Sequence, residues 1–462
     1  MKGPQTSTME KVLETIVPDA GTGKPVLWGA HSNKAKWEST IGVLTLIVGC
    51  PTLCIMNWVA LEQFDGALTK VIGAALDYGP VLYLLENLPR PSQDAIVGYA
   101  AWLLFQAFLY GFLPGETCYG QKTPAGYQLH YKTNGLLAWT LTHALFIGGA
   151  WYGYIDPAII ARNWEGLLVA CNVYGFVLAV LAQVKGHLFP SHPEDRKFSG
   201  SWIYDFWAGV ELNPRFGSYW DFKFFHNGRP GIVAWTLINM SWAAYQYQTV
   251  GYVTYSMIVL NILQAIYVVD FFCNESWYTR TIDISHDHFG FMLAWGDATF
   301  LPTFYTLQAQ YLARYPTHLS EGQAIGILAL GLLGYYIFRS ANWQRDYVRS
   351  KKGEARIWGR PAEFIRCKYH TSDGKEHESL LLTSGWWGVA RHSNYFADLI
   401  GCFAYCVTCG FNNILPWSYF FFMIVLLTHR AKRDERRCRA KYGEKWDEYC
   451  RAVPYTMIPG VF

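Results

Sequence analysis

The stretch LLTHRAKRDERRCRAKYG, residues 426–443, follows directly on an apolar run at 414–427. A helix that leaves a bilayer here would continue without a break into a cluster of cations. At a helical spacing of three to four residues, one face carries cations, a carboxylate, a thiol and aromatic hydroxyls. We call this set the cationic face: Arg430, Asp434, Cys438, Lys441, Tyr442 and Tyr449. Lys432, Arg436 and Arg439 are expected to point elsewhere.

Basic residues gather at the cytoplasmic ends of membrane spans in proteins of every function, so the cations alone do not indicate a site. That rule leaves unexplained why one carboxylate stands among the cations, in line with two tyrosines. Such a set suits a polyphosphate that carries a hydrogen-bonding base or a nicotinamide.

The composition predicts an all-α polytopic membrane protein. Of 462 residues, 52% are hydrophobic, 17% aromatic and only 16% charged, and the apolar blocks approach bilayer length. A net charge of +3 is too small to indicate nucleic-acid binding. Cys402, Cys406 and Cys409 lie in an apolar span with no nearby His, so we interpret them as buried thiols and expect no metal site.

We expect about ten transmembrane helices in one membrane domain, residues 37–462, after a polar cytosolic N-terminus, residues 1–36, without a removable signal peptide. An even number of spans and a basic tail place both termini in the cytosol. A small cytosolic hairpin is predicted from Phe364–Tyr369 and Ser379–Leu382 around an Asp373-Gly374 turn. The expected spans are Ile41–Leu61, Ala95–Leu113, Gly135–Ile155, Glu165–Val184, Gly231–Val250, Val253–Phe272, Phe289–Leu312, Ala324–Phe338, Phe396–Cys409 and Ile414–Leu427, with Val71–Leu85 as a shallower segment.

Two further features point to a site. Asn342, Arg345 and Arg349 share a helical face, with two guanidiniums one turn apart, which suits a phosphate monoester. Carboxylates at the spans, such as Asp297 and Asp398, indicate either a functional cavity or hydrogen bonds between helices. Neither GxGxxG nor GxxxxGK[ST] is present, so a dinucleotide would not bind through a Rossmann turn.

The stretch GSWIYDFWAGVELNPR, residues 200–215, resembles the first signature of the sterol reductase family, and residues 426–443 resemble the second. Asn227–Gly231 and Asp283–Gly290 also resemble family sequences. The resemblance extends from Leu113 to Phe462. It implies a ten-helix membrane fold, a sterol that enters from the bilayer lipid, and NADPH bound by the half of the chain from about residue 320 to 462. Since we expect no removable signal peptide, the endoplasmic reticulum or a similar internal membrane is the expected location. Association with other enzymes of sterol biosynthesis is a further expectation.

Carried over by position, the resemblance implies the following cofactor contacts: Arg345, Arg349, Leu382, Trp387, Asn394, Tyr395, Asp434, Cys438, Arg439, Ala440, Lys441, Tyr442 and Tyr449. The residue chemistry adds Arg430. It assigns Arg345 and Arg349 to the 2′-phosphate, and Arg430 and Lys441 to the pyrophosphate. It assigns Trp387 to ring stacking and Asp434 to the carboxamide or ribose.

Reduction of an unpolarised carbon–carbon double bond needs an acid that protonates it and a hydride that quenches the cation. We expect Tyr267 and Asp434 on the proton path, with Glu275, Asp297 and His286 held in reserve, although Tyr267 is also consistent with an interfacial or packed tyrosine. The resemblance favours the 7,8 double bond of 5,7-dienes of the 7-dehydrocholesterol type, and a sterol delta-14 reductase is the alternative. An isoprenylcysteine-type membrane methyltransferase and a non-catalytic sterol-binding scaffold are alternatives of other classes.

Overall fold

The computed structural model describes residues 35–370 and 376–461, which are mostly helical. Almost all of the predicted N-terminal segment 1–36, and the predicted Asp373-Gly374 turn, lie outside these residues. Contacts divide the chain into two compact units, which we describe separately. The amino unit comprises residues 29–324 and 407–418, and the carboxy unit comprises residues 325–406 and 419–462 as its main parts. The boundary at Ile325 lies close to the expected start of the cofactor-binding half.

Six long helices form the frame of the amino unit, and each falls on an expected span. They are α2 (Trp37–Gln63), α5 (Gln93–Phe112), α6 (Gly135–Trp151), α8 (Trp164–Leu188), α11 (Val233–Val250) and α12 (Tyr255–Cys273). The expected shallow segment consists of α3 (Leu68–Tyr78) and α4 (Pro80–Glu86), bent by 113°. Gly79 lies between them with a φ of 99°, and Pro80 has no N–H to continue the α3 ladder.

The expected span 289–312 is not one continuous helix. It consists of α15 (Phe291–Trp295), η3 (Gly296–Phe300), α16 (Leu301–Phe304) and α17 (Leu307–Arg314), and η3 is a π-helical turn. Pro302 cannot donate a backbone hydrogen bond and its ring crowds the preceding turn, so the helix widens before it.

Five helices in the described part of the chain are long and apolar enough to cross a membrane: α2, α5, α8, α12 and α18 (Glu321–Ser350). The count is six if the bent pair α3 and α4 forms one span. The protein is therefore a helical membrane protein. The expected ten spans are not confirmed, because the remaining helical segments are shorter, broken or less apolar.

Short elements connect the long helices of the amino unit. β1 (Glu116–Lys122) pairs antiparallel with β2 (Gln128–Thr133), a hairpin that the sequence analysis did not predict. The remaining short elements are α7 (Ile159–Arg162), η1 (Pro193–Asp195), α9 (Trp202–Ala208), β3 (Arg215–Phe216), β4 (Trp220–Asp221), α10 (Phe222–His226), η2 (Asn227–Ile232), α13 (Glu275–Tyr278) and α14 (Ile282–Ser285).

The first signature has a packing role. Gly209, with a φ of 88°, lies so close to Gly290 that a Cβ on either residue would fall within 2.5 Å of backbone atoms of the other. Asp205 is buried and accepts a hydrogen bond of 2.9 Å from the Ser199 N–H. The signature therefore fixes the loop after α8 against the loop before α15.

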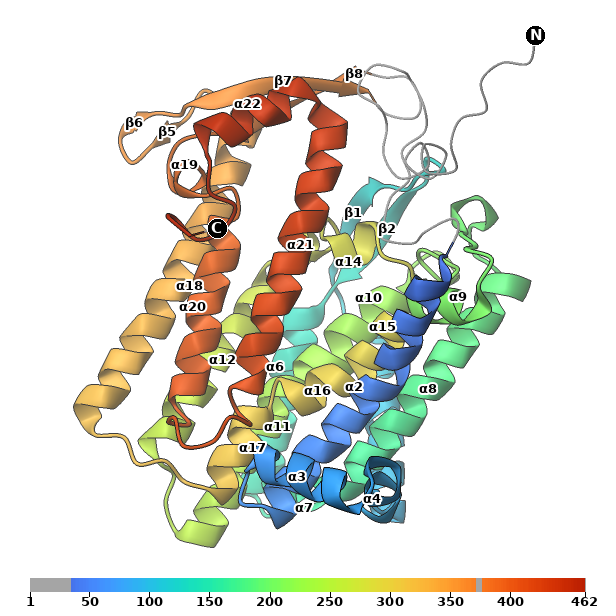
Figure 1. Cartoon of the computed structure of the whole chain (residues 1–462), viewed down its shortest axis with the longest axis vertical. Coiled ribbons are helices and arrows are strands. Elements are labelled where there is room, and N and C mark those ends of the chain that lie inside the picture. The colour runs from blue at the N-terminus through green and yellow to red at the C-terminus, as the bar shows by residue number, and fades with distance from the viewer. Residues whose placement is uncertain (1–34, 371–375, 462) are drawn as a thin grey trace. The chain divides into compact units, whose positions relative to one another are not determined.

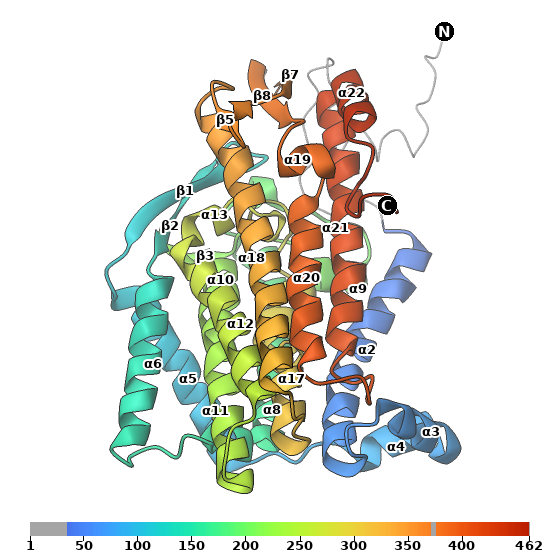
Figure 2. The same ribbon diagram turned by 90° about the vertical axis from the view of Figure 1, so that its left-hand side faces the viewer.

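The carboxy unit combines three helices with a hairpin. Figures 1 and 2 show α18, α20 (Ser393–Val407) and α21 (Ser418–Tyr442) side by side, with β7 (Phe364–His370), β8 (Glu376–Leu382) and α22 (Glu444–Ala452) at one end. β5 (Arg356–Ile357), β6 (Arg360–Pro361) and α19 (Trp386–Val389) complete it. β7 pairs antiparallel with β8 from Phe364↔Leu382 to His370↔Glu376, which confirms the predicted hairpin.

The hairpin contributes to two apolar clusters. Leu380 and Leu382 pack with Val348 of α18 and Trp387 of α19. Leu381 points to the opposite face of the strand and packs with Tyr442, Trp446 and Tyr449. The hairpin therefore joins the end of α18 to the end of α21 and to α22.

Candidate functional site

The predicted orientation of α21 is confirmed. Lys432, Arg436 and Arg439 are exposed, whereas the members of the cationic face are partly or fully buried. Tyr442 and Tyr449 are the buried members, and Tyr449 is contributed by α22. Neighbours in sequence such as Cys438 and Arg439 thus face different environments according to helical phase, since Cys438 is partly buried and Arg439 is exposed.

Arg345 lies over the indole of Trp387. Its Cζ is 4.6 Å from the ring centroid, and its Nη2 donates a weak hydrogen bond of 3.4 Å to Asn342 Oδ1. Trp387 is 6% exposed and donates from Nε1 to the carbonyl of Ala341 at 2.7 Å. The guanidinium thus covers one face of the ring that the sequence analysis assigned to stacking, and Trp387 serves as a platform for Arg345.

Two buried polar atoms at the start of α20 have no hydrogen-bond partner in the described part of the chain. Asn394 donates from Nδ2 to Asn342 Oδ1 at 3.3 Å, but its Oδ1 is unpartnered. His392 stacks on Tyr395, with centroids 5.0 Å apart, and its Nε2 is likewise unpartnered. Buried polar atoms normally have partners, so these two atoms are suited to a ligand.

Asp434 forms an ion pair with Arg437, one turn further along α21. Burial raises the pKa of Asp434, but Arg437, His392 and Arg345 outweigh burial and hold that pKa below its ordinary value. The carboxylate is therefore ionised at neutral pH and acts as a hydrogen-bond acceptor. Burial raises the pKa of the neighbouring Cys438 thiol to about 12, so Cys438 is protonated.

Lys441 lies over the ring of Tyr369 on β7, with Nζ 3.7 Å from the centroid. Burial and, after it, Arg437 lower the pKa of Lys441 to about 8. The Tyr442 hydroxyl lies 3.4 Å from Ser379 Oγ on β8. The hairpin thus supplies one wall beside the end of the cationic face.

The structure brings the main predicted contacts together. Arg345 interacts electrostatically with Arg349, Asp434, Tyr395 and Tyr449, which come from α18, α21, α20 and α22. Within the described residues, no carboxylate forms an ion pair with Arg345, Arg349 or Lys441. Unneutralised cations, an ionised acceptor and unpartnered amide and imidazole atoms are a donor and acceptor set that fits a phosphorylated dinucleotide.

Three predicted contacts have interactions within the protein. Leu382 is buried in an apolar cluster and contributes packing. Arg349 is exposed and donates from Nε to the carbonyl of Leu380 at 3.3 Å. Arg439 is exposed and pairs with Asp447 at 3.2 Å.

Sequence reasoning missed the role of Arg391. Its guanidinium donates to Glu435 Oε1 at 2.8 Å, to the carbonyl of Val453 at 2.7 Å and to Thr456 Oγ1 at 2.9 Å. These bonds fasten the start of α20 to α21 and to the C-terminal segment. No local sequence motif predicts these bonds, because the acceptors lie 44 to 65 residues from Arg391 in the sequence.

In the amino unit, Tyr267 is partly buried on α12, and its ring lies 5.5 Å from that of Trp235. Glu275 forms a buried ion pair with Arg229, and its second oxygen accepts from the Gly135 N–H at 2.8 Å. Arg229 also donates to Asn134 Oδ1 at 2.8 Å. Both Glu275 oxygens are therefore engaged in joining α6, η2 and α13. Asp297 accepts from Asn227 Nδ2 at 3.0 Å.

Comparison with known proteins relates the chain to one family over nearly its whole length. The model of the "Ergosterol biosynthesis ERG4/ERG24 family" matches residues 31–462. The chain is 47% identical to the 7-dehydrocholesterol reductase of Xenopus laevis over 448 residues, which is 94% of each chain. It is 45% identical to that of Danio rerio over 452 residues, 95% of this chain and 94% of the relative. It is 37% identical to the Delta(14)-sterol reductase of Methylotuvimicrobium alcaliphilum over 419 residues, 91% of this chain and 94% of the relative.

Proposed function

Because the chain belongs to the ergosterol biosynthesis ERG4/ERG24 family, we propose that this membrane sterol reductase uses NADPH to reduce the 7,8 double bond of sterol 5,7-dienes. The chain is an oxidoreductase of sterol biosynthesis, as its relatives imply. The observation that supports the choice of cofactor is the convergence of Arg345 and Arg349 of α18 with Tyr395 of α20, Asp434 of α21 and Tyr449 of α22.

The cofactor is held by groups of the carboxy unit alone. Arg345 and Arg349 bind the 2′-phosphate, for which a planar fork of donors is well matched. Lys441 and Arg430 bind the pyrophosphate. The unpartnered Asn394 Oδ1 and the ionised Asp434 accept hydrogen bonds from the carboxamide or ribose. Bound NADPH supplies a hydride, which an isolated double bond accepts only after protonation.

The chain must therefore place a proton on the sterol. We assign that step to the Tyr267 hydroxyl, since Asp434 is ionised and both Glu275 oxygens are engaged elsewhere. Protonation of a 5,7-diene leaves an allylic cation, which is more stable than the cation from an isolated alkene. Aromatic faces beside Tyr267, such as that of Trp235, would stabilise this allylic cation through cation–π interactions.

The preference for the 7,8 double bond rests on the relatives. The two vertebrate proteins named 7-dehydrocholesterol reductase share 47% and 45% of residues with the chain. The proteins named Delta(14)-sterol reductase share 37% and 34%. A delta-14 reductase remains the second candidate, because these relatives also cover nine-tenths of the chain.

Two proposals extend the function to the cell. We place the enzyme in the endoplasmic reticulum membrane, where its substrate enters from the surrounding lipid. We also propose that it associates with other enzymes of sterol biosynthesis.

Expression in yeast followed by mass spectrometry of the sterols tests the reaction. Wild-type protein is expected to deplete 5,7-dienes and to leave their 7,8-saturated products. The double variant Arg345→Ala/Arg349→Ala, expressed at the same level, should leave the dienes in place, and Arg436→Ala on the exposed side of α21 serves as the matched control. Unchanged dienes with wild-type protein, together with correction of a 14,15-unsaturated sterol, would select the second candidate.

The sterol profile and the thermal unfolding of the purified protein test the two alternatives of other classes, a sterol-binding scaffold and a membrane methyltransferase. A sterol-binding scaffold would leave every sterol unchanged. A membrane methyltransferase would be stabilised against thermal unfolding by S-adenosylmethionine and not by NADPH, whereas we expect stabilisation by NADPH only.

A further inference from the structure

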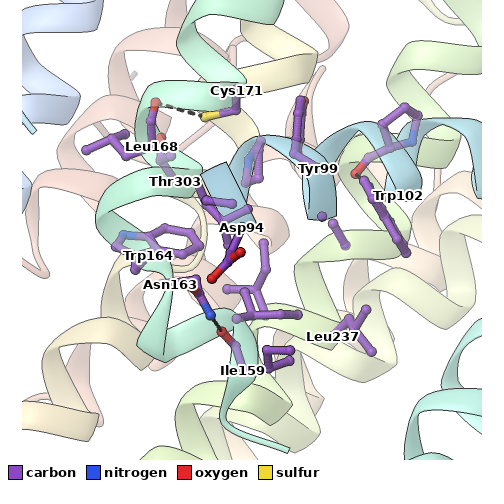
Figure 3. Close-up of a pocket in the computed structure, with 18 of the residues that line it drawn as sticks. Asp94, Tyr99, Trp102, Ile159, Asn163, Trp164, Leu168, Cys171, Leu237 and Thr303 are labelled. Carbon is purple, nitrogen blue, oxygen red and sulfur yellow. Dashed lines mark hydrogen bonds between the residues drawn. The ribbon is translucent and has the colours of Figure 1, made fainter. Parts of the chain in front are cut away.

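A cavity of about 400 Å³ lies within the amino unit, between α5, α8, α11 and the segment from η3 to α16. Its lining includes Gly98 of α5 and Leu167 of α8. Figure 3 shows Tyr99 and Trp102 of α5 and Leu168 of α8 at the cavity. All of its lining residues belong to the amino unit, and neither the proposed acid Tyr267 nor any predicted cofactor contact is among them. The cavity therefore requires its own explanation.

The interior of the cavity offers almost no polar group to a ligand. The Tyr99 hydroxyl donates to the carbonyl of Ala298 at 3.3 Å, and Trp102 Nε1 donates to that of Pro230 at 3.3 Å. Thr303 donates to the carbonyl of Thr299 at 2.7 Å. These three donors are already hydrogen-bonded to backbone carbonyls, so the walls present mainly hydrocarbon and aromatic surface to a ligand.

One end of the cavity is polar. Asp94 stands in the first turn of α5 and Asn163 is the N-cap of α8, and Figure 3 shows both at the cavity. Gly166 brings the two helix starts together, because a Cβ there would lie 2.7 Å from the Cβ atoms of Ser92 and Ala95. Asp94 has no hydrogen-bond or ion-pair partner in the described part of the chain. Asn163 uses its Nδ2 on the carbonyl of Ile159 at 2.8 Å, and its Oδ1 has no such bond there.

The shape of the cavity follows from its two main walls. Lining residues recur along α5 from Asp94 to Trp102 and along α8 from Trp164 to Cys171. At 1.5 Å per residue, each wall runs for roughly 12 Å along a rigid helix. Asp94, Gly98 and Ile159 are exposed at the rim, and the first two belong to α5, which is long and apolar enough to cross a membrane. The site is a rigid apolar slot that opens to the bilayer and carries acceptors at one end.

We propose that this cavity binds a sterol at a second site, whose lining includes neither Tyr267 nor any predicted cofactor contact, with the sterol hydroxyl donating to Asp94. A sterol is a rigid apolar body with one hydroxyl at one end, which matches the slot. A helix end is also the depth at which the hydroxyl of a membrane sterol lies. A two-chain phospholipid is too large for the volume and needs partners for a charged headgroup. The inference rests on the sterol chemistry of the family and not on which double bond is reduced.

Gly98 provides a variant that fills the slot. A Cβ at Gly98 would meet no atom within 4 Å, so Gly98→Phe projects its ring into the cavity without a backbone clash. Gly49 on α2 is the matched control, because it is exposed, also has free space around its Cβ and does not line the cavity. Asp94→Ala is a second variant that keeps the volume and removes the acceptor.

The test is photoaffinity labelling of the purified full-length protein in phosphatidylcholine nanodiscs, with a diazirine-bearing cholesterol and without NADPH. Labelled peptides are expected in 93–112 and 164–188, competed by cholesterol and not by added phosphatidylcholine. Gly98→Phe should abolish this labelling and Gly49→Phe should retain it. Asp94→Ala should make cholesterol about tenfold less effective as a competitor.

Sterol turnover provides the independent readout. Gly98→Phe is expected to keep turnover within about twofold of wild type, since neither Tyr267 nor any predicted cofactor contact lines the slot. Labelling confined to other segments, labelling that persists in Gly98→Phe, or displacement by phospholipid would overturn the proposal. Loss of turnover in Gly98→Phe at an unchanged unfolding temperature would identify the slot as the reaction centre and would also overturn it. None of these results depends on whether the 7,8 or the 14,15 bond is reduced.

Discussion

The guanidinium of Arg345 lies over the indole of Trp387, with Cζ 4.6 Å from the ring centroid. This contact links a cation of α18 to the platform that follows β8. It also explains why a residue expected to stack on the cofactor is 6% exposed. Trp387 orients the Arg345 guanidinium, which we propose binds the 2′-phosphate of NADPH.

Removal of this platform is expected to weaken NADPH binding without abolishing the chemistry. Trp387→Leu removes a cation–π contact of about 0.5–2 kcal/mol, which corresponds to a rise of roughly 2- to 30-fold in KM for NADPH. Trp387→Phe keeps an aromatic face and should show a smaller rise. Steady-state kinetics of the purified variants measure the effect, and a fall in kcat at unchanged KM would argue against the platform role.

Charge removal at Arg345 and Arg349 should discriminate between NADPH and NADH. A charge-assisted hydrogen bond contributes about 1.5–3 kcal/mol, so each Arg→Ala variant should raise KM for NADPH roughly 10- to 100-fold. The KM for NADH should change little, since NADH lacks the 2′-phosphate. Arg436→Ala is the control, because this residue is exposed on the opposite side of α21. Equal effects on both cofactors would refute the 2′-phosphate assignment.

Burial and Arg437 lower the pKa of Lys441 to about 8. The affinity for NADPH should therefore fall as the pH rises through this value. Below this pKa the ammonium is charged and attracts the pyrophosphate, and above it the amine is neutral. The second pKa of a phosphate monoester is about 6, so the charge of the 2′-phosphate changes little as the pH rises through 8. Lys441→Arg keeps its charge and should bind NADPH with an affinity independent of pH between 7 and 9. Titration of cofactor binding measures this, and an equal slope in wild type and Lys441→Arg would contradict it.

Glu275 is expected to contribute to stability and not to proton transfer. Glu275→Gln leaves the fully buried Arg229 charge without its partner, at a cost of about 3–5 kcal/mol. The double variant Arg229→Gln/Glu275→Gln removes both charges and should recover part of the loss. Thermal unfolding in detergent checks this order of stabilities. If Glu275→Gln unfolds at the wild-type temperature but has lost turnover, Glu275 would again be a candidate for the proton donor.

Tyr267→Phe removes the hydroxyl and keeps the ring packed against Trp235. General acid catalysis contributes about 10²- to 10⁴-fold, so turnover should fall by that order while NADPH affinity stays the same. The neighbouring Phe271→Leu, also on α12, controls for altered packing. Full activity of Tyr267→Phe would exclude it from the mechanism.

Helical phase made part of the site predictable from sequence. The spacing of Arg430, Asp434, Cys438 and Lys441 separates them from the exposed Lys432 and Arg436, and the structure has the same division. The β7–β8 hairpin was predicted for a similar reason, since strand patterns flank a turn signal. In both cases a local pattern determines the local structure.

Contacts between distant segments could not be predicted in this way. The hydrogen bonds of Arg391 depend on acceptors from α21 and the C-terminal segment, and the Arg229–Glu275 pair joins residues 46 positions apart. The break at η3 depends on how Pro302 is accommodated by the turns around it, which apolarity alone does not reveal. The apolar blocks therefore predicted where the long helices lie, but the expected span 289–312 is broken and the count of ten spans is not confirmed.

The most direct test of the central claim is the stoichiometry of the purified enzyme with 7-dehydrocholesterol and NADPH. We predict that one NADPH is oxidised for each 7,8 double bond lost, with the 5,7-diene absorbance and the NADPH absorbance falling together. Loss of neither signal, while a 14,15-unsaturated sterol is reduced under the same conditions, would contradict the account.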